Sequence, residues 1–312
     1  MMNKEKNFVS AVVYMHNSER VIKDFVSDLI SVLSENFEKA EIICVNDCST
    51  DNTVMEVKEV SKNSKGISVS VINMSYFHGL EIAMNAGVDL AIGDFVFEFD
   101  RADRDYELDE IMKVYRKSLE GYDIVGAVPN KKQKLTSKLF YKVVEKNSRV
   151  KYKLFSESFR ILSRRVINRI DSMNKNVPYR KIAYANSGLK VTSLKYDVVK
   201  TLKSTNDRME KRYRKSLATD ALIMFTDIGY NLSLFMTGLM MAVGIFMGVY
   251  SIVIYFMSAP VAGWTTTILF LSLVSFGLFA VLSVIIKYLQ IIVNLSFKRK
   301  KYNFESIEKL TK

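Results

Sequence analysis

A long stretch without charged side chains is the feature that most constrains this sequence. Between Asp227 and Lys287 there are 59 residues with no Asp, Glu, Lys, Arg or His, in a chain of which 25% is charged. A run of that length needs a physical cause, and the natural one is the hydrocarbon interior of a membrane. A purely cytosolic globular protein is therefore excluded.

The uncharged run is long enough for two membrane-spanning helices. Residues 232–257 and 266–288 each exceed the ~20 residues that a helix needs to cross a bilayer. Between them lies a short turn that contains Pro260 and Gly263. We therefore expect a two-helix transmembrane hairpin within residues 228–292, and its helices offer a surface for homo-oligomer formation.

The basic residues predict the orientation of this hairpin. Lys and Arg are dense before the first span and after the second, in the tail over residues 293–312, but absent from the turn. By the positive-inside rule, both ends should lie in the cytoplasm. The first residues show no apolar signal-peptide segment, which also favours a cytoplasmic N-terminal region and a multi-pass protein of the bacterial inner membrane.

A second basic segment precedes the spans. Residues 131–153 hold nine Lys or Arg against one acid, Glu145, and apolar side chains gather on one helical face that includes Leu139 and Val143. This pattern predicts an amphipathic helix that contacts anionic membrane lipids, although a solvated helix covering a sheet is the alternative. No nucleic-acid-binding motif accompanies these charges, so we expect no nucleic acid partner.

The region before the spans has the pattern of a soluble α/β domain. Short apolar runs at residues 8–15, 41–45, 67–74 and 95–99 alternate with segments of helical periodicity. Alternation of this kind predicts a parallel, doubly wound sheet of Rossmann-like type. Ligands bind such sheets at the carboxyl ends of the strands. Those ends are marked by Asn17, Asp47, His78 and Asp100.

Three segments in order give the sequence a family resemblance. FVSAVVYMHNSE, EIICVNDCSTDNT and HGLEIAMNAGVDLAIGDFVFEFD resemble the nucleotide-sugar-binding half of family 2 glycosyltransferases, which have the glycosyltransferase A-type fold. TSKLFYKVV, SFRILSRRVI and the C-terminal apolar segments resemble the polyprenyl-phosphate branch of that family, related to dolichyl-phosphate mannose synthase. The resemblance covers nearly the whole chain.

The resemblance implies a function and a division of the chain. It implies transfer of one sugar from a nucleotide donor, usually UDP-linked, to undecaprenyl phosphate at the cytoplasmic face, for modification of a cell-envelope glycan. Residues 1–130 would form the nucleotide-sugar-binding core, and residues 131–227 the acceptor side and membrane interface. A lipid-linked saccharide or polymer as acceptor, or a catalytically weakened homologue, are the alternatives.

The resemblance also assigns roles to individual residues, with Asp47 accepting a hydrogen bond from the base. The expected nucleotide-binding residues are Tyr14, Asn17, Glu19, Asp47, His78, Arg212 and Tyr213. The expected catalytic residues are Asp100, Asp103, Glu157 and Arg160. Asp100 and Asp103 would also hold Mg²⁺ or Mn²⁺, which suit an all-oxygen site and stabilise a diphosphate leaving group.

Two departures from the family pattern leave parts of this assignment open. Relatives carry Asp-x-Asp at the fourth strand, but Ala102 stands at the second position here. We favour Asp103 as the replacement over Asp105, and Arg101 with Arg104 could instead supply part of the cation's charge. Relatives also carry Asp-Phe-Arg where this chain has Ser158-Phe159-Arg160, with Glu157 one residue away. A phosphate acceptor is already anionic, so this second loss is tolerable.

Overall fold

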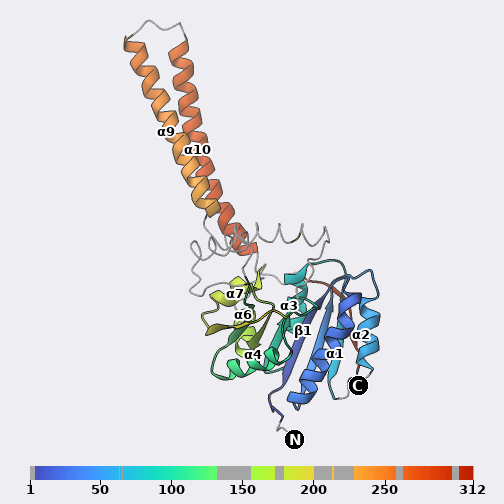
Figure 1. The fold of residues 1–312 in the computed structure, drawn as a ribbon. Helices are drawn as coiled ribbons and strands as arrows, with labels where there is room; N and C mark the ends of the chain where they lie inside the picture. Colours follow the sequence, from blue (N-terminus) through green and yellow to red (C-terminus); the bar gives the residue numbers. More distant parts are fainter. Residues whose placement is uncertain are drawn as a thin grey trace. The chain divides into compact units, whose positions relative to one another are not determined.

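The computed structural model of the chain contains two compact units. It describes residues 4–62, 64, 66–131, 156–172, 179–199, 213, 228–257, 263–296 and 302–311. One unit comprises residues 1–218 together with 299–312, and the other comprises residues 219–298 (Figure 1). The expected amphipathic helix over residues 131–153 falls almost wholly outside the described residues, and so does Arg212.

The first unit is built on one mixed sheet of eight strands, in the order β7-β5-β6-β4-β1-β2-β3-β8. Within it, β1 to β4, β5 and β7 run parallel, whereas β6 and β8 run antiparallel to their neighbours. The strands are β1 (Val9–Met15), β2 (Ala40–Asn46), β3 (Ser68–Met74), β4 (Phe95–Phe99), β5 (Ile124–Pro129), β6 (Phe159–Ser163), β7 (Val191–Tyr196) and β8 (Phe304–Lys309). The predicted alternation of strands and helices is confirmed, but the sheet is not purely parallel.

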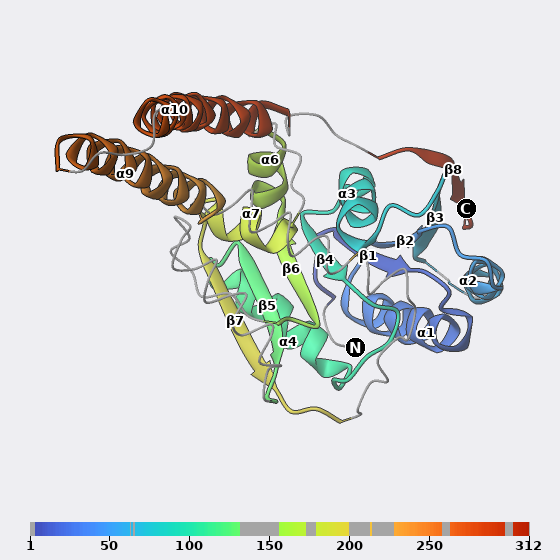
Figure 2. The same cartoon turned by 90° about the horizontal axis from the view of Figure 1, so that it is seen from above.

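Helices cover both faces of this sheet (Figure 2). On one face, α1 (Glu19–Asn36), α2 (Thr53–Ser61) and α4 (Asp109–Leu119) bury apolar side chains such as Ile22, Val57 and Ile111. On the other, α3 (Leu80–Leu90), α6 (Arg164–Ser172) and α7 (Arg180–Asn186) do the same. The central strands are buried on both sides, which is why they read as continuous apolar runs.

Close packing of α3 on the sheet requires a glycine. A Cβ atom at Gly87 would lie 2.4 Å from a methyl group of Val12 and 2.6 Å from one of Val45. Only a residue without a side chain lets the helix approach β1 and β2 this closely. The approach sets α3 directly against the two central strands β1 and β2.

The strand β8 was not predicted from the sequence. This strand lies in what was expected to be a basic tail, yet it pairs antiparallel with β3, from Ser70 opposite Lys309 to Met74 opposite Phe304. It therefore covers an edge of β3 that would otherwise present unpaired backbone groups. The C-terminal residues belong to the same compact unit as the sheet.

The second unit contains two long apolar helices, α9 (Ile228–Met257) and α10 (Trp264–Ser296). Their segments Ser233–Met257 and Trp264–Leu289 are long and apolar enough to cross a membrane, and they match the predicted spans closely. The two helices run side by side and antiparallel in both views (Figures 1 and 2). Large apolar side chains such as Phe246 (67% exposed) and Phe270 (68%) point away from the pair, as expected for contact with lipid.

Candidate active site

The loops that follow β1 and β2 are tied to each other at the carboxyl edge of the sheet. Asn17 and Cys48 have positive φ angles of 47° and 57°, which turn each chain sharply after its strand. The side-chain carbonyl of Asn17 accepts a hydrogen bond from the Thr50 amide at 2.8 Å, and the Glu19 carboxylate accepts one from the Asn52 amide at 3.2 Å. Asn17 and Glu19 thus fix the shape of this edge.

Asp47 lies at the centre of the same edge and is fully buried. Its two carboxylate oxygens accept hydrogen bonds from the backbone amides of His78 and Gly79, each at 2.7 Å, and from the Tyr14 hydroxyl at 3.0 Å. The structure therefore brings together Tyr14, Asp47 and His78, as expected, and gives Asp47 a role in holding the loop between β3 and α3. Its contact with a nucleotide base stays a prediction.

Tyr213 closes over this loop. A Cβ atom on Gly79, whose φ is 83°, would lie 2.2 Å from the Tyr213 ring, so only glycine fits beneath the tyrosine. The Tyr213 hydroxyl accepts a hydrogen bond from the backbone amide of Glu81 at 3.3 Å. The tyrosine expected at the nucleotide site thus lies against the residues that hold Asp47.

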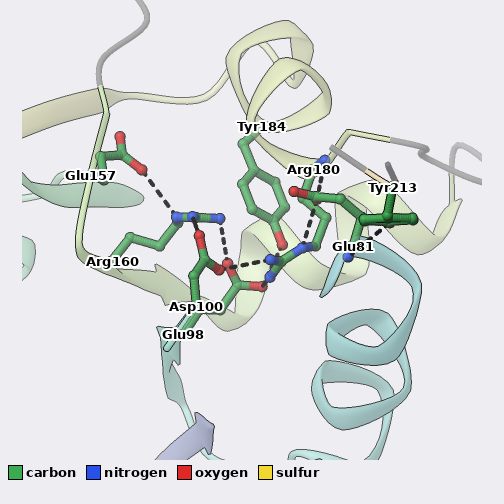
Figure 3. A network of polar contacts seen from close by, with 8 residues as sticks. All are labelled: Glu81, Glu98, Asp100, Glu157, Arg160, Arg180, Tyr184 and Tyr213. Carbon is green, nitrogen blue, oxygen red and sulfur yellow. Dashed lines mark hydrogen bonds and ion pairs between the residues drawn. The ribbon is translucent and has the colours of Figure 1, made fainter. Parts of the chain in front are cut away.

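A second cluster begins at the end of β4, where two arginines meet two acids (Figure 3). Arg160 donates to Asp100 at 2.6 Å and to Glu98 at 2.8 Å. Arg180 donates to the other oxygen of Asp100 at 2.7 Å and to the other oxygen of Glu98 at 2.7 Å. Both guanidinium groups are 1% exposed, so these are buried ion pairs rather than surface contacts.

Further groups complete the cluster. The Glu157 carboxylate accepts from Arg160 at 3.0 Å, and the Glu81 carboxylate accepts from Arg180 at 3.0 Å. The Tyr184 hydroxyl donates to Glu98 at 2.7 Å. Four carboxyl groups thus surround two guanidinium groups. Because Glu81 also contacts Tyr213, this cluster and the Asp47 loop are parts of one site.

Electrostatics keep the cluster charged. Burial alone would raise the pKa of Asp100, but Arg160 and Arg180, together with Lys181, outweigh burial and hold the pKa well below its usual range. Burial would likewise lower the pKa of Arg160, yet Asp100, Glu98 and Glu157 raise it above its ordinary value. Asp100 is therefore an ionised carboxylate throughout the physiological range, as a metal ligand must be.

The two acids that could replace the missing second Asp have different partners. Asp103 accepts two hydrogen bonds from Arg101, at 2.7 and 3.0 Å. Asp105 is buried and is held by Lys131, Ser158 and Tyr196 at 2.8, 3.1 and 2.6 Å. The role of either acid as a metal ligand stays a prediction.

The arginines of the same loop are also engaged. Arg104 donates to the carboxylate of Asp28 at 2.9 Å and to the carbonyl of Tyr106 at 3.0 Å. Arg101 is joined to Asp103. These contacts direct Arg104 toward α1, whereas the buried positive charges beside Asp100 come from Arg160 and Arg180.

The donor set of the site suits a metal bound jointly with substrate. Among the residues that the structure describes, no group of three His, Cys, Asp or Glu side chains is arranged to hold a metal ion. Mg²⁺ is commonly held by one or two carboxylates and completed by substrate phosphates. Asp100, whose side chain is 13% exposed at the strand end, is a carboxylate of that kind, and each of its oxygens also accepts a hydrogen bond from a buried arginine. Its role as a metal ligand stays a prediction.

Sequence reasoning missed four members of the second cluster: Glu81, Glu98, Arg180 and Tyr184. One indication of Glu98 was present, since an acid within the apolar strand FVFEF is costly unless it is paired. Nothing comparable marks Arg180, because its partners lie 80 to 99 residues away in the chain.

Comparison with known proteins shows the family and the fold of the chain. Residues 10–175, more than half of the chain, match the family described as Glycosyl transferase family 2. Among solved structures, a mannosyltransferase from Pyrobaculum calidifontis, in complex with GDP-Man and Mn²⁺, is similar with a TM-score of 0.50 and 13% identity, over 70% of this chain and 63% of that one. Glucosyl-3-phosphoglycerate synthase of Mycobacterium tuberculosis is similar with a TM-score of 0.50 and 16% identity, over 71% of this chain and 81% of that one. These likenesses confirm the expected A-type fold.

Three relatives extend the comparison along the chain. An uncharacterized glycosyltransferase of Bacillus subtilis, YkcC, is 26% identical over 90% of this chain and 88% of its own length. One from Synechocystis, sll0501, is 31% identical over 61% of this chain and 60% of its own. The undecaprenyl-phosphate 4-deoxy-4-formamido-L-arabinose transferase of Aeromonas hydrophila is 27% identical over 54% and 52%. The match thus spans little more than half of the last two relatives.

The buried cluster predicts a large effect of Glu98 on stability. Replacing Glu98 with Ala leaves Arg160 and Arg180 buried with fewer partners, which should lower the free energy of unfolding by about 3–5 kcal/mol. Glu120→Ala is the matched control, because Glu120 forms a surface pair with Lys117 worth less than about 1 kcal/mol. Thermal denaturation of the purified full-length variants compares the two. Equal stability of both variants would contradict the prediction.

Proposed function

Because the chain belongs to glycosyl transferase family 2, we propose that it is a membrane-bound enzyme that transfers one sugar from a UDP-linked donor to undecaprenyl phosphate at the cytoplasmic face of the membrane. The observation that carries the proposal is the ionised Asp100 at the end of β4, held by two buried arginines next to the Asp47 loop. The excess of carboxylates at this edge suits a divalent cation bound together with a phosphorylated ligand.

The reaction separates a nucleoside diphosphate from a sugar. An anionic oxygen of the acceptor phosphate attacks C1 of the sugar, the bond from C1 to the diphosphate oxygen breaks, and the nucleoside diphosphate leaves with the electron pair. The acceptor needs no deprotonation at neutral pH, so the absence of an Asp at Ser158 is compatible with this chemistry. Arg160 and Arg180 hold the Asp100 carboxylate in place at this end of the site, and with four carboxylates around the two guanidinium groups the cluster itself carries an excess of negative charge.

The nucleoside is assigned to the edge formed by the first two loops. In this proposal its wall is formed by Tyr14, Asn17 and Glu19, with Tyr213 and His78 at the β3 side. The buried Asp47 lies beneath them and holds the loop between β3 and α3. Rigid ties among these residues support the assignment, since a binding loop that is already ordered loses less entropy when the ligand binds.

A divalent cation belongs to the proposal as well. Asp100, with Asp103, would hold Mg²⁺ or Mn²⁺, and the cation would supply charge stabilisation at the diphosphate. Solved relatives of similar fold were obtained with Mn²⁺, which supports the same chemistry here. In this proposal Asp100 contacts the cation at the donor end of the site, where its lowered pKa keeps the carboxylate ionised.

The acceptor assignment rests on the relatives and on the apolar helices. The Aeromonas relative is named for transfer to undecaprenyl phosphate, and α9 and α10 are long and apolar enough to cross a membrane, which supports a lipid acceptor. A lipid-linked saccharide is the second candidate acceptor. Ala102 and Ser158 stand at the two positions where relatives carry Asp, and those positions concern metal binding and acceptor binding.

The connection of the chain supports the proposed topology. The sheet strands β1 to β7 precede the two apolar helices, and β8 follows them and pairs with β3 in the same sheet. If both helices cross the bilayer, the start of α9 and the end of α10 must therefore lie on the same side of it. The basic flanks make that side the cytoplasm.

Removal of the charge on Asp100 should abolish most transfer. Asp100→Asn keeps the shape of the side chain but weakens metal and arginine contacts, so transfer of labelled sugar into extractable lipid should fall by a factor of about 10² or more. Asp109→Asn, on the exposed start of α4, is the control and should keep normal activity. Normal transfer by Asp100→Asn, or full activity of the native chain in excess EDTA, would refute metal-assisted transfer at Asp100.

The hairpin predicts where introduced cysteines react. In a Cys48→Ser background, which removes the exposed native thiol, a cysteine in place of Gly263 should react with a membrane-impermeant maleimide applied to intact cells. A cysteine in place of Lys309 should react only after the cells are opened. Labelling of both positions in intact cells would contradict a cytoplasmic sheet.

A further inference from the structure

The segment Tyr302–Thr311, here called the C-terminal clasp, contacts the sheet at both ends of the segment. Tyr302 packs against the apolar cluster beneath α3, and its hydroxyl donates to Asp89 at 2.6 Å. At the other end, Leu310 packs against the apolar cluster on the opposite face, and its amide donates to the Val69 carbonyl at 2.8 Å. The clasp is thus fixed from both faces of the sheet.

The start of the clasp contacts the loop that holds Asp47. The Asn303 carbonyl accepts a hydrogen bond from the Ser75 amide at 3.2 Å, and the Asn303 amide donates to Nε2 of His78 at 3.2 Å. The His78 ring is 2% exposed and stacks on Tyr76 with the ring centres 3.9 Å apart. A histidine from the first half of the chain is thereby held by a residue that follows the second apolar helix.

The contacts of His78 define its tautomer. Its Nδ1 lies 2.6 Å from the Tyr76 carbonyl, which can only accept, so Nδ1 carries the hydrogen. Its Nε2 then has a free lone pair and accepts from Asn303. Both ring nitrogens are therefore engaged in holding the ring, and neither is directed to a substrate.

The backbone of His78 links the Asn303 contact to the candidate donor site. The His78 amide donates to one oxygen of Asp47, and the next amide, of Gly79, donates to the other. Movement of His78 would thus displace both amides that orient the Asp47 carboxylate. Contacts run without interruption from Asn303 through His78 to Asp47.

We propose that the C-terminal clasp is a positioning element of the nucleotide site, and that it acts through the hydrogen bond from Asn303 to His78. The proposal rests on the proposed function, because it takes the Asp47 edge to be where the nucleoside binds. The residues that follow the second apolar helix would then contribute to donor affinity, in addition to covering the edge of β3.

Two variants of His78 separate the two ring nitrogens. The side-chain oxygen of His78→Gln can reach the position of Nε2 and accept from Asn303, whereas His78→Asn can replace only Nδ1. The affinity for UDP with Mn²⁺, measured by calorimetry on the full-length protein, should fall about tenfold in His78→Asn and much less in His78→Gln. The KM for polyprenyl phosphate should remain near that of the native chain in both.

A second pair of variants acts on the other partner. Asn303→Pro removes the backbone N–H that donates a hydrogen bond to Nε2 of His78. Asn303→Ala keeps this N–H and changes only an exposed side chain. UDP affinity should fall about tenfold in Asn303→Pro and remain within twofold of the native value in Asn303→Ala. The thermal midpoint of each variant, measured in parallel, identifies any variant that fails to fold.

The outcomes distinguish this inference from the proposed function. If the native chain binds UDP, and folded Asn303→Pro and His78→Asn bind it equally well, the clasp has no positioning role. An equal loss in His78→Gln and His78→Asn would also overturn the link through Nε2. If the native chain binds neither UDP nor GDP, the proposed function itself fails, and the inference fails with it.

Discussion

The organisation of the candidate site depends on two guanidinium groups buried between acids. Arg160 comes from β6 and Arg180 from α7, and both reach Glu98 on β4 and Asp100 directly after it. Glu98 is fully buried, so neither arginine can leave without exposing an unpaired charge to the protein interior. The positions of β6, α7 and the first turn of α3 relative to the end of β4 are thereby fixed together.

A buried cluster of this kind contributes little net stability, because the cost of removing charges from water offsets most of their attraction. The location of the cluster is what links it to function. It lies at the carboxyl edge of the sheet, where α/β proteins bind ligands, and it joins the Asp47 loop through Glu81 and Tyr213. Hydrogen bonds and ion pairs therefore order this edge, and four carboxylates around two guanidinium groups give the cluster an excess of negative charge.

Physical patterns in the sequence were sufficient to predict the main elements. The uncharged run located both apolar helices, the alternation of apolar runs located the first four strands, and the strand ends located Asp47 and Asp100. These features are local, because hydrophobic periodicity and turn residues act over a few positions. The family resemblance added Glu157 and Arg160, which the structure places together beside Asp100.

The remaining features depend on contacts between distant segments. The strand β8 reads FESIEK and shows no apolar alternation, because its apolar residues Phe304 and Ile307 are exposed at the sheet edge and its half-buried positions are polar. Arg180 lies in no motif, and only the folded chain brings it to Glu81 and Asp100. The antiparallel β6 was likewise hidden, since a buried strand reads the same in either direction.

The position of the bound nucleotide tests the account most directly. The measurement is the structure of the full-length chain with UDP and Mn²⁺, with the metal located from its anomalous scattering. The account predicts the nucleoside at the edge formed by Tyr14 and Asp47, and the metal peak beside the Asp100 carboxylate. A nucleotide bound at another part of the chain, or a metal with no contact to Asp100, would contradict it.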